Sequence, residues 1–323
     1  MPKNNYKFSM NLKEFQHNDW VQIWAGQWSL LTCSYLGNHL TKDIKYQSKC
    51  FSQLIITIKE GKSACWARES DKDRFGTYLA KRAVNDPKFV KSLCAGIIRE
   101  VDTMLAFIDK YEGKFLNLDQ FQLFWKRVGQ YYQRHVPIKY TVDYLDPSSF
   151  KKYFDDFEKA RIYAEPVFTR VEEFSLAFIK LVAKKEKLPI EAARCITGQE
   201  MEEYLLGKNL PDKKVLLQRD KNAVLLFDAK TQELLPGAGL SQVEKMLLGS
   251  VVADKLTGFS AYPGKAQGRV HIVKDLAKTK DFKVGEILVT GMTRPEFLHL
   301  IKKAAAFVTD AGGMLSHAAI TAR

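Results

Sequence analysis

The sequence predicts an α+β protein in which a large, mostly α-helical N-terminal region is followed by a small β/α region. Three observations lead to this prediction. Apolar residues recur at helical spacing through most of residues 1–248, whereas short alternating runs and glycine turns dominate residues 249–323. The chain has 323 residues, which is longer than a single hydrophobic core usually grows. We therefore expect two domains, 1–248 and 249–323.

Composition and charge narrow the classes of function. Hydrophobic residues make up 46% of the chain and charged residues 27%, which is typical of a soluble globular protein. The formal net charge is +13, but no five-residue basic run occurs, so we interpret it as a solvated basic surface and do not favour nucleic acid as a partner. No stretch of about 18 apolar residues is present, which argues against a membrane span. The five cysteines form no C-x-x-C pair, so we expect reduced thiols, a cytoplasmic protein and no metal site.

The helical region is predicted from apolar residues that share one helix face. Its clearest stripe steps by four and three residues in turn. A second segment, FQLFWKRVGQYY at 121–132, spaces its aromatic side chains likewise and directs Lys126, Arg127 and Gln130 away from them. We interpret these aromatics as helix-packing core, although they could also line a ligand pocket. Prolines are expected at helix boundaries because they lack the backbone donor. The stripe is Val167, Val171, Phe174, Phe178 and Leu181, and the prolines are Pro87, Pro137, Pro147, Pro166 and Pro189.

Two kinds of local signal complete the first region. Thr197 followed by Glu200 predicts a capping box for a short helix that stops at Gly207. Two segments predict β-hairpins within the helical domain. LIITIKEGKSACWA is expected to turn near Glu60–Gly61, and VLLQRDKNAVLLFD near 220–222.

Residues 249–323 read as short strands joined by turns and helices. In GFSAYPGKAQGRVHIV, a proline–glycine turn precedes an alternating strand over residues 269–273. GEILVTGM predicts another strand, and PEFLHLIKKA predicts a helix that begins at Pro295. AAFVTD predicts a short buried strand that leads through Gly312–Gly313 into a helix, SHAAITAR, for which Ser316 is the candidate N-cap.

The residues around His317 form a candidate anion site. Free backbone N–H groups at a helix start point toward a ligand, and the helix dipole adds partial positive charge there. An imidazole in that first turn is disfavoured as a cation, which leaves a neutral and nucleophilic ring. Glycines at 312 and 313 permit unusual backbone conformations and close approach. By this reasoning alone His317 could be a phosphoryl carrier, a cap or a packed polar residue, and the other five histidines form no cluster.

The run MTRPEFLHLIKKAAAFVTDAGGMLSHAAITAR, with AYPGKAQGRVHIV and GEILVTG upstream, resembles the mobile phosphohistidine domain of the phosphoenolpyruvate (PEP)-utilising enzymes. The resemblance implies that His317 is the histidine that is transiently phosphorylated. It implies that Gly312, Gly313 and Ser316 support the turn that binds phosphate. The remaining positions that the resemblance links to phosphate are Thr293, Arg294 and Arg323.

The resemblance also implies functions that this sequence does not contain by itself. We expect a phosphotransferase component that carries a phosphoryl group between an ATP or PEP site and an acceptor such as pyruvate, as in PEP synthase or pyruvate phosphate dikinase. The sequence shows no ATP-grasp domain and no PEP/pyruvate-binding barrel, so we expect both as partners or on missing sequence, together with ATP and Mg²⁺. The mobile domain is expected to be incomplete at its C-terminus and to swivel about a hinge near residues 248–257.

Two alternatives stay open. One is part of a rifampicin phosphotransferase-like antibiotic kinase, in which the helical region would bind the acceptor. The other is a non-catalytic binding or scaffold protein that retains the histidine motif, for which the basic charge leaves room for an anionic partner such as nucleic acid. Stable phosphorylation of His317 would argue against the scaffold, and steep salt dependence of nucleic-acid binding would favour it.

Overall fold

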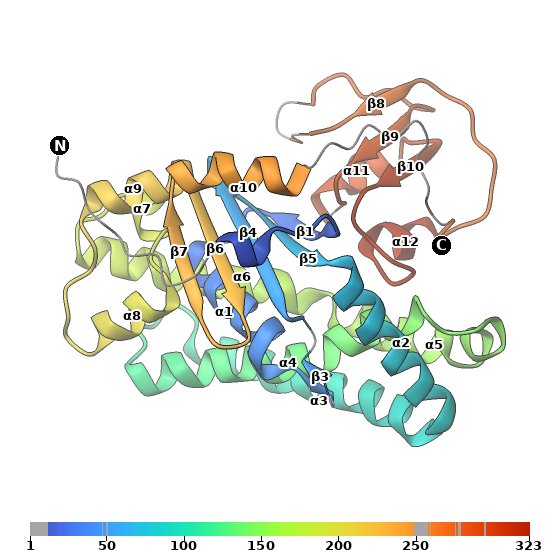
Figure 1. Ribbon diagram of the computed structural model, residues 1–323, viewed down its shortest axis with the longest axis horizontal. Helices are drawn as coiled ribbons and strands as arrows, with labels where there is room; N and C mark the ends of the chain where they lie inside the picture. Colours follow the sequence, from blue (N-terminus) through green and yellow to red (C-terminus); the bar gives the residue numbers. More distant parts are fainter. Residues whose placement is uncertain are drawn as a thin grey trace.

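The structure is a computed structural model that describes residues 12–46, 48–49, 51–248, 258, 260–274, 276, 279–293 and 295–323. Figure 1 shows a larger body of helices around a sheet and a smaller part, in red and orange, built from the C-terminal strands and helices. Helices and strands occur in both parts, so the predicted α+β class is confirmed. Within the described residues, no helix is both long and apolar enough to cross a bilayer.

A five-stranded antiparallel sheet forms the centre of the larger body, in the order β1-β5-β4-β6-β7. Both faces are covered, so the middle strands are apolar at successive positions. Ile55 and Val224 pack with helix α10, while Ile56 and Leu225 face the main helical core. The strands are β1 (Trp20–Gly26), β4 (Gln53–Lys59), β5 (Lys62–Arg68), β6 (Asn222–Asp228) and β7 (Gln232–Pro236).

One of the two predicted hairpins is confirmed and the other is wrong. β4 and β5 are joined by Glu60 and Gly61, whose φ angles of 49° and 70° form the predicted tight turn. Residues Lys213–Lys221 form helix α9 and not a strand, because the Asp212 side chain accepts a hydrogen bond from the amide of Lys214 at 2.7 Å and begins a helix. Strand β6 instead pairs with β7.

Helices cover the sheet and carry most of the buried apolar surface. Prolines 87, 147 and 166 each occupy the first turn of a helix, as predicted. The predicted boundary at Pro137 is wrong, because α4 continues through it. Proline cannot donate to the carbonyl of Gln133, which instead accepts from the Tyr46 hydroxyl at 2.9 Å. The long helices are α2 (Glu69–Asn85), α3 (Pro87–Tyr111), α4 (Leu118–Val142), α5 (Pro147–Ala164) and α6 (Pro166–Lys185).

The aromatic segment at 121–132 belongs to the core, in line with the helix-packing interpretation. Phe121, Trp125 and Tyr131 are each only 1% exposed. The Trp125 ring stacks on Tyr35 with centroids 4.2 Å apart. The capping box of Thr197 with Glu200 is also confirmed, and it begins α8. The remaining elements of this part are η1 (Leu12–Phe15), α1 (Leu30–Asn38), η2 (His39–Asp43), β2 (Lys45–Tyr46), β3 (Ser48–Lys49), α7 (Ile190–Ala193), α8 (Gly198–Leu205) and α10 (Ala238–Leu248).

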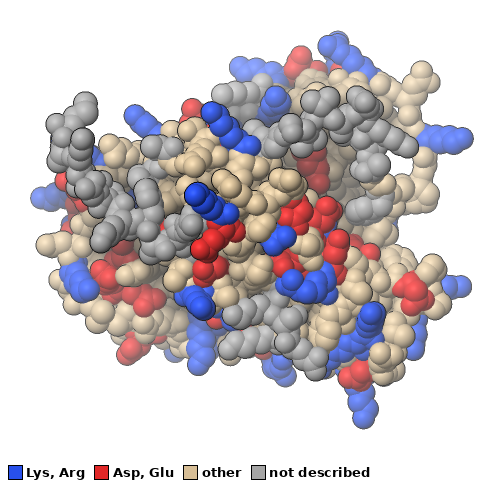
Figure 2. All heavy atoms as spheres, in the orientation of Figure 1, with Lys and Arg blue, Asp and Glu red and all other residues tan. Residues whose placement is uncertain are grey.

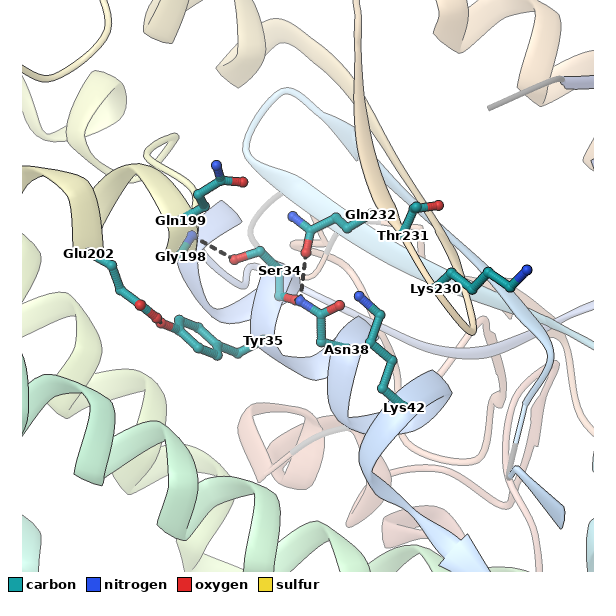
Figure 3. A pocket seen from close by; sticks show the side chains of 10 residues that line it. All are labelled: Ser34, Tyr35, Asn38, Lys42, Gly198, Gln199, Glu202, Lys230, Thr231 and Gln232. Carbon is teal, nitrogen blue, oxygen red and sulfur yellow. Dashed lines mark hydrogen bonds between the residues drawn. The ribbon is translucent and has the colours of Figure 1, made fainter. Parts of the chain in front are cut away.

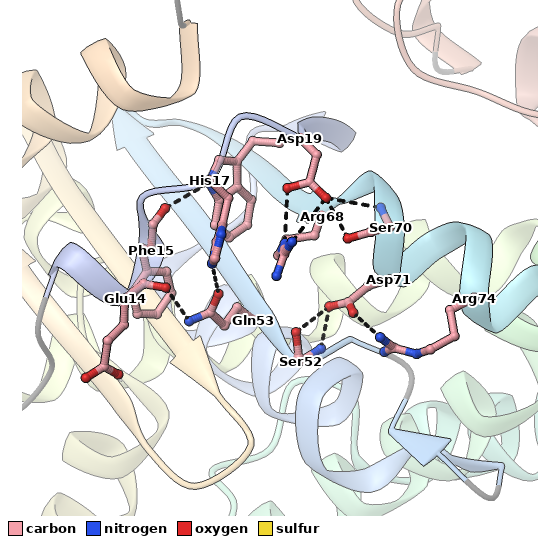
Figure 4. Close-up of polar contacts among 11 residues, drawn as sticks. Glu14, Phe15, His17, Asp19, Ser52, Gln53, Arg68, Ser70, Asp71 and Arg74 are labelled. Carbon is pink, nitrogen blue, oxygen red and sulfur yellow. Dashed lines mark hydrogen bonds and ion pairs between the residues drawn. The ribbon is translucent and has the colours of Figure 1, made fainter.

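Polar contacts join the start of α2 to the sheet, as Figure 4 shows. Asp19 accepts from Nε of Arg68 at 3.1 Å and from the Ser70 hydroxyl at 2.5 Å. Asp71 is 1% exposed and accepts from both the amide and the hydroxyl of Ser52. Hydrogen bonds to these two carboxylates, of which Asp71 is buried, fix the position of the helix relative to the strands.

The C-terminal part has a three-stranded parallel sheet in the order β10-β9-β8. One face packs on Leu288, Phe297, Leu300 and neighbours, and the helix predicted at Pro295 begins as a 3₁₀ turn. The opposite face is open: Val270, Ile272 and Val308 are 56%, 62% and 57% exposed. Parallel sheets are normally covered on both faces. The elements are β8 (Val270–Ile272), β9 (Ile287–Thr290), η4 (Pro295–Phe297), α11 (Leu298–Ile301), β10 (Ala306–Thr309) and α12 (His317–Ala322).

Charged side chains of both signs are interspersed on the face drawn in Figure 2. That distribution agrees with a solvated surface more than with a continuous basic patch on this face.

Candidate functional site

The proposed carrier histidine is the first residue of helix α12. Ser316 precedes it, and the Ser316 Oγ accepts from the amide of Ala319 at 3.2 Å, so the predicted N-cap is confirmed. Among the hydrogen bonds of the described residues, none uses the amides of His317 and Ala318. Two backbone donors next to the imidazole can therefore bind an anion.

A threonine fixes the orientation of the His317 ring. Thr293 follows β9, is 3% exposed, and its Oγ1 lies 3.1 Å from Nδ1 of His317. When Nδ1 carries the proton and donates it to Thr293, the lone pair is on Nε2. Within the described part of the chain, Nε2 has no hydrogen-bond partner. Nε2 is thus the nitrogen that is free to act as a nucleophile.

The surroundings keep this imidazole neutral. Burial lowers the pKa of His317 below its usual value and is the largest influence on it. The carboxylate of Glu165 raises the pKa, the guanidinium of Arg161 lowers it, and Glu296 raises it, with a net decrease. A neutral ring at pH 7 retains the lone pair that nucleophilic attack requires.

Arg161 is a candidate site residue that the sequence analysis missed. It lies on α5, is 7% exposed, and donates through Nη1 to Glu165 at the junction of α5 and α6. Its Cζ also lies 5.7 Å from the centre of the Phe168 ring. A guanidinium has five N–H donors, and among described contacts only the bond to Glu165 is found. The only local signal was an i, i+4 Arg–Glu pair, which is common on helix surfaces.

Gly312 and Gly313, the two glycines of the turn, differ in which atoms lie close to them. Neither has a positive φ, in contrast to Gly61 and Gly285, so the unusual backbone conformations that glycine permits do not occur at these two positions. Close approach does occur. A Cβ on Gly313 would lie 2.3 Å from Oδ2 of Asp143, whereas a Cβ on Gly312 would lie 3.2 Å from Oγ of Ser316.

Of the two arginines that the resemblance links to phosphate, the structure describes the contacts of Arg323 only. Arg323 donates through Nε to Glu158 at 2.7 Å and through Nη2 to the Met314 carbonyl at 2.8 Å. Its guanidinium also lies 4.8 Å from the centre of the Phe154 ring. These contacts join the end of α12 to α5, and a phosphate contact by Arg323 stays a prediction. Arg294 lies outside the described residues.

A pocket of about 410 Å³ opens elsewhere, between α1, α8 and the β6–β7 turn (Figure 3). None of the predicted site residues lines it. Its polar groups largely bind one another: the Asn38 amide donates to Gln232 at 2.7 Å, and the Gly198 amide donates to Ser34 at 2.8 Å. Within the described residues, no group of three or more His, Cys, Asp or Glu side chains is placed to hold a metal ion.

Comparison with known proteins shows where the sequence is similar to established families. Residues 282–323 match the family described as "PEP-utilising enzyme, mobile domain". A probable phosphoenolpyruvate synthase of Pyrococcus abyssi is 33% identical over 134 residues, which cover 42% of this chain and 16% of that protein. The phosphoenolpyruvate synthase of Pyrococcus furiosus is 48% identical over 68 residues, or 21% of this chain and 8% of that protein. The "Uncharacterized phosphotransferase YvkC" of Bacillus subtilis is 40% identical over 83 residues, or 24% of this chain and 10% of that protein.

The relatives named above are two phosphoenolpyruvate synthases, one of them described as probable, and one uncharacterised phosphotransferase. Residues 282–323 are thus similar to the mobile domain of the PEP-utilising enzymes. Its matched segments span less than a fifth of the length of each relative named above.

Proposed function

We propose that this chain carries a phosphoryl group on Nε2 of His317 between an ATP or PEP site and an acceptor such as pyruvate. The observation that carries the proposal is the orientation of one imidazole. Thr293 lies 3.1 Å from Nδ1, while Nε2 has no partner among the described residues, and the amides of His317 and Ala318 at the helix start are unused.

Each step can be written with its atoms balanced. The Nε2 lone pair attacks the phosphorus of the donor, the bond from phosphorus to the donor oxygen breaks, and that oxygen leaves with the electron pair. Nδ1 keeps its proton and its bond to Thr293 throughout. In the second step an acceptor oxygen attacks the same phosphorus, the P–N bond breaks, and the electron pair returns to Nε2. The amides of His317 and Ala318 stabilise charge on the transferred group.

The donor and acceptor sites belong to other domains in this proposal. An ATP-grasp domain and a PEP/pyruvate-binding domain, in trans or on further sequence, supply ATP, Mg²⁺ and the acceptor. Residues 1–248 and 249–323 act as two domains, and the second swivels about a hinge near 248–257. Residues 249–257 of that hinge lie outside the described part of the chain.

A test that needs no protein donor uses phosphoramidate, a small N–P compound. Imidazole attack on it releases ammonia and forms phosphohistidine. We expect the purified chain to gain one acid-labile, base-stable phosphate, and His317→Ala to gain none. Label of equal amount and stability on His317→Ala would contradict the proposal, as would unlabelled wild-type chain whose His317 is accessible to diethylpyrocarbonate.

One observation favours a second candidate for the site at which the phosphoryl group is accepted, on the helical region of this chain. Arg161 and Glu165 of the helical region lie near enough to His317 to influence its pKa, and there a cation and a carboxylate could receive a phosphoryl group and an acceptor hydroxyl. This arrangement supports a rifampicin phosphotransferase-like use of the helical region. The aromatic residues of 121–132 are core residues and would not form that pocket. Binding of a hydroxylated drug to the isolated chain, lost in Arg161→Met, distinguishes this candidate from the first.

A further inference from the structure

The turn before His317 contacts the helical region through one carboxylate. Asp143 is the C-cap of α4, and its Oδ1 accepts from the amide of Met314 at 2.8 Å, across 171 residues of sequence. Hydrogen bonds with a charged acceptor are among the stronger ones in proteins. This bond exists only while the C-terminal part lies against the end of α4.

The absence of a side chain at Gly313 leaves room for the carboxylate of Asp143. A Cβ at this position would lie 2.3 Å from Oδ2 of Asp143 and 2.9 Å from both Oδ1 and Cγ. Real Cβ atoms do not approach other atoms so closely, so any side chain at 313 would displace the carboxylate. Because Gly313 does not have a positive φ, its backbone conformation alone does not require glycine.

Further contacts on either side of Gly313 also join residues 313–323 to the helical region. Leu315, two residues beyond Gly313, is 1% exposed and belongs to the core of the helical region. Arg323 reaches Glu158 at 2.7 Å from the other end of α12. The turn and both ends of α12 therefore meet α4 and α5 together.

We propose that Asp143 is a positioning residue that docks the phosphohistidine segment on the helical region, and that Gly313 is glycine in order to admit this carboxylate. The role assigned to Gly313 is thus docking, and phosphate binding is left to the amides of His317 and Ala318. This proposal does not depend on phosphoryl transfer. The docking role of Asp143 can be wrong while the proposed function is right, and the proposed function can be wrong while the docking role is right.

Hydrogen exchange of the full chain measures docking without any phosphoryl donor. Asp143→Ala removes the acceptor of the Met314 amide, so we expect peptides that cover 309–323 to exchange about 10- to 100-fold faster. Gly313→Ala should produce a similar increase because the new methyl group expels the carboxylate. Peptides from strands β4 and β6 serve as an internal control and should keep their exchange rates, since they lie in the central sheet.

The decisive comparison is the double variant Asp143→Ala/Gly313→Ala. With the carboxylate gone, the methyl group at 313 has room, so the double variant should exchange no faster than Asp143→Ala alone. Gly312→Ala is the matched control, because its Cβ meets Ser316 within the same segment and its effect should be equal in both backgrounds.

Three results would overturn the proposal. The first is an equal acceleration by Gly313→Ala with and without Asp143, which would place the steric conflict elsewhere. The second is unchanged exchange of 309–323 in Asp143→Ala. The third concerns Asp143→Asn, which keeps an oxygen acceptor but loses the charge. Its rate should fall between those of wild type and Asp143→Ala, and a rate outside that interval would contradict the assignment.

Discussion

The Oγ1 of Thr293 lies 3.1 Å from Nδ1 of His317, and this contact selects which ring nitrogen is free. Thr293 is buried, so the hydroxyl is held in place by its surroundings and not by solvent. We expect Thr293→Val to slow phosphorylation of His317 by phosphoramidate about tenfold, because the ring loses the partner that fixes its tautomer. Thr293→Ser keeps the hydroxyl and should stay close to wild type. Equal rates for the valine and serine variants would show that the contact has no such role.

Arg161 and Glu165 should move the pKa of His317 in opposite directions. The guanidinium lowers this pKa and the carboxylate raises it. Arg161→Met is therefore expected to raise the pKa of His317, and Glu165→Gln to lower it, as followed by NMR titration of the imidazole. The pKa of His317 in the double variant should lie between the values in the two single variants, and the double variant avoids leaving the buried Arg161 charge without its partner. Shifts of the same sign in both single variants would refute this electrostatic description.

His135 is expected to make the fold sensitive to acid. It is 5% exposed, and neither ring nitrogen has a hydrogen-bond partner among the described residues. Burial lowers its pKa well below the usual value, with Arg161 and Lys139 acting in the same direction. The unfolded chain therefore takes up a proton near pH 6.5 that the folded chain does not bind. Below that pH the free energy of unfolding should fall by up to about 1.4 kcal/mol per pH unit.

The matched variant for this prediction is His135→Leu. It removes two unpaired polar atoms and the titrating group while keeping a similar volume, so it should raise the free energy of unfolding by about 1 kcal/mol at pH 7. The difference from wild type should grow between pH 7 and pH 5 in urea unfolding. A constant difference over that range would mean that His135 is not the acid-sensitive group.

The open face of the C-terminal sheet should promote self-association. Ile272 and Val308 lie on that face and are more than half exposed. We expect Ile272→Thr/Val308→Thr to lower the fraction of dimers and larger species in sedimentation velocity, with little change in stability. Leu288→Thr, on the covered face, should instead cost about 2–3 kcal/mol of stability. Unchanged association in the threonine pair would show that another surface is responsible.

Local signals predicted the elements around His317 well. Ser316 has the side chain of an N-cap, and the glycine pair and short apolar strand before it are visible in the sequence. The same local reasoning failed where a distant group decided the outcome. Pro137 does not end its helix, because a hydroxyl from Tyr46 satisfies the carbonyl that proline leaves free. The stretch after Asp212 became a helix because that side chain caps it, although its apolar residues also fit a strand.

The residues of the helical region that lie near His317 could not be predicted from local sequence patterns. Asp143 contacts the histidine turn and Arg161 influences the pKa of His317, in each case across more than 150 residues of sequence, and their neighbours along the chain look like an ordinary helix end and helix surface. They come together because residues 313–323 lie against the end of α4 and against α5. Gly313 was correctly expected to allow close approach, but the group that approaches it is a carboxylate of the same chain.

Direct identification of the phosphorylated atom tests the proposed function most sharply. The chain, labelled with ¹⁵N in its histidines, would be treated with phosphoramidate and examined by ³¹P and ¹⁵N NMR. We predict a single phosphohistidine at position 317 with phosphorus bonded to Nε2 and with Nδ1 still protonated. Phosphate on Nδ1, on another residue, or on the His317→Ala chain would contradict the proposal.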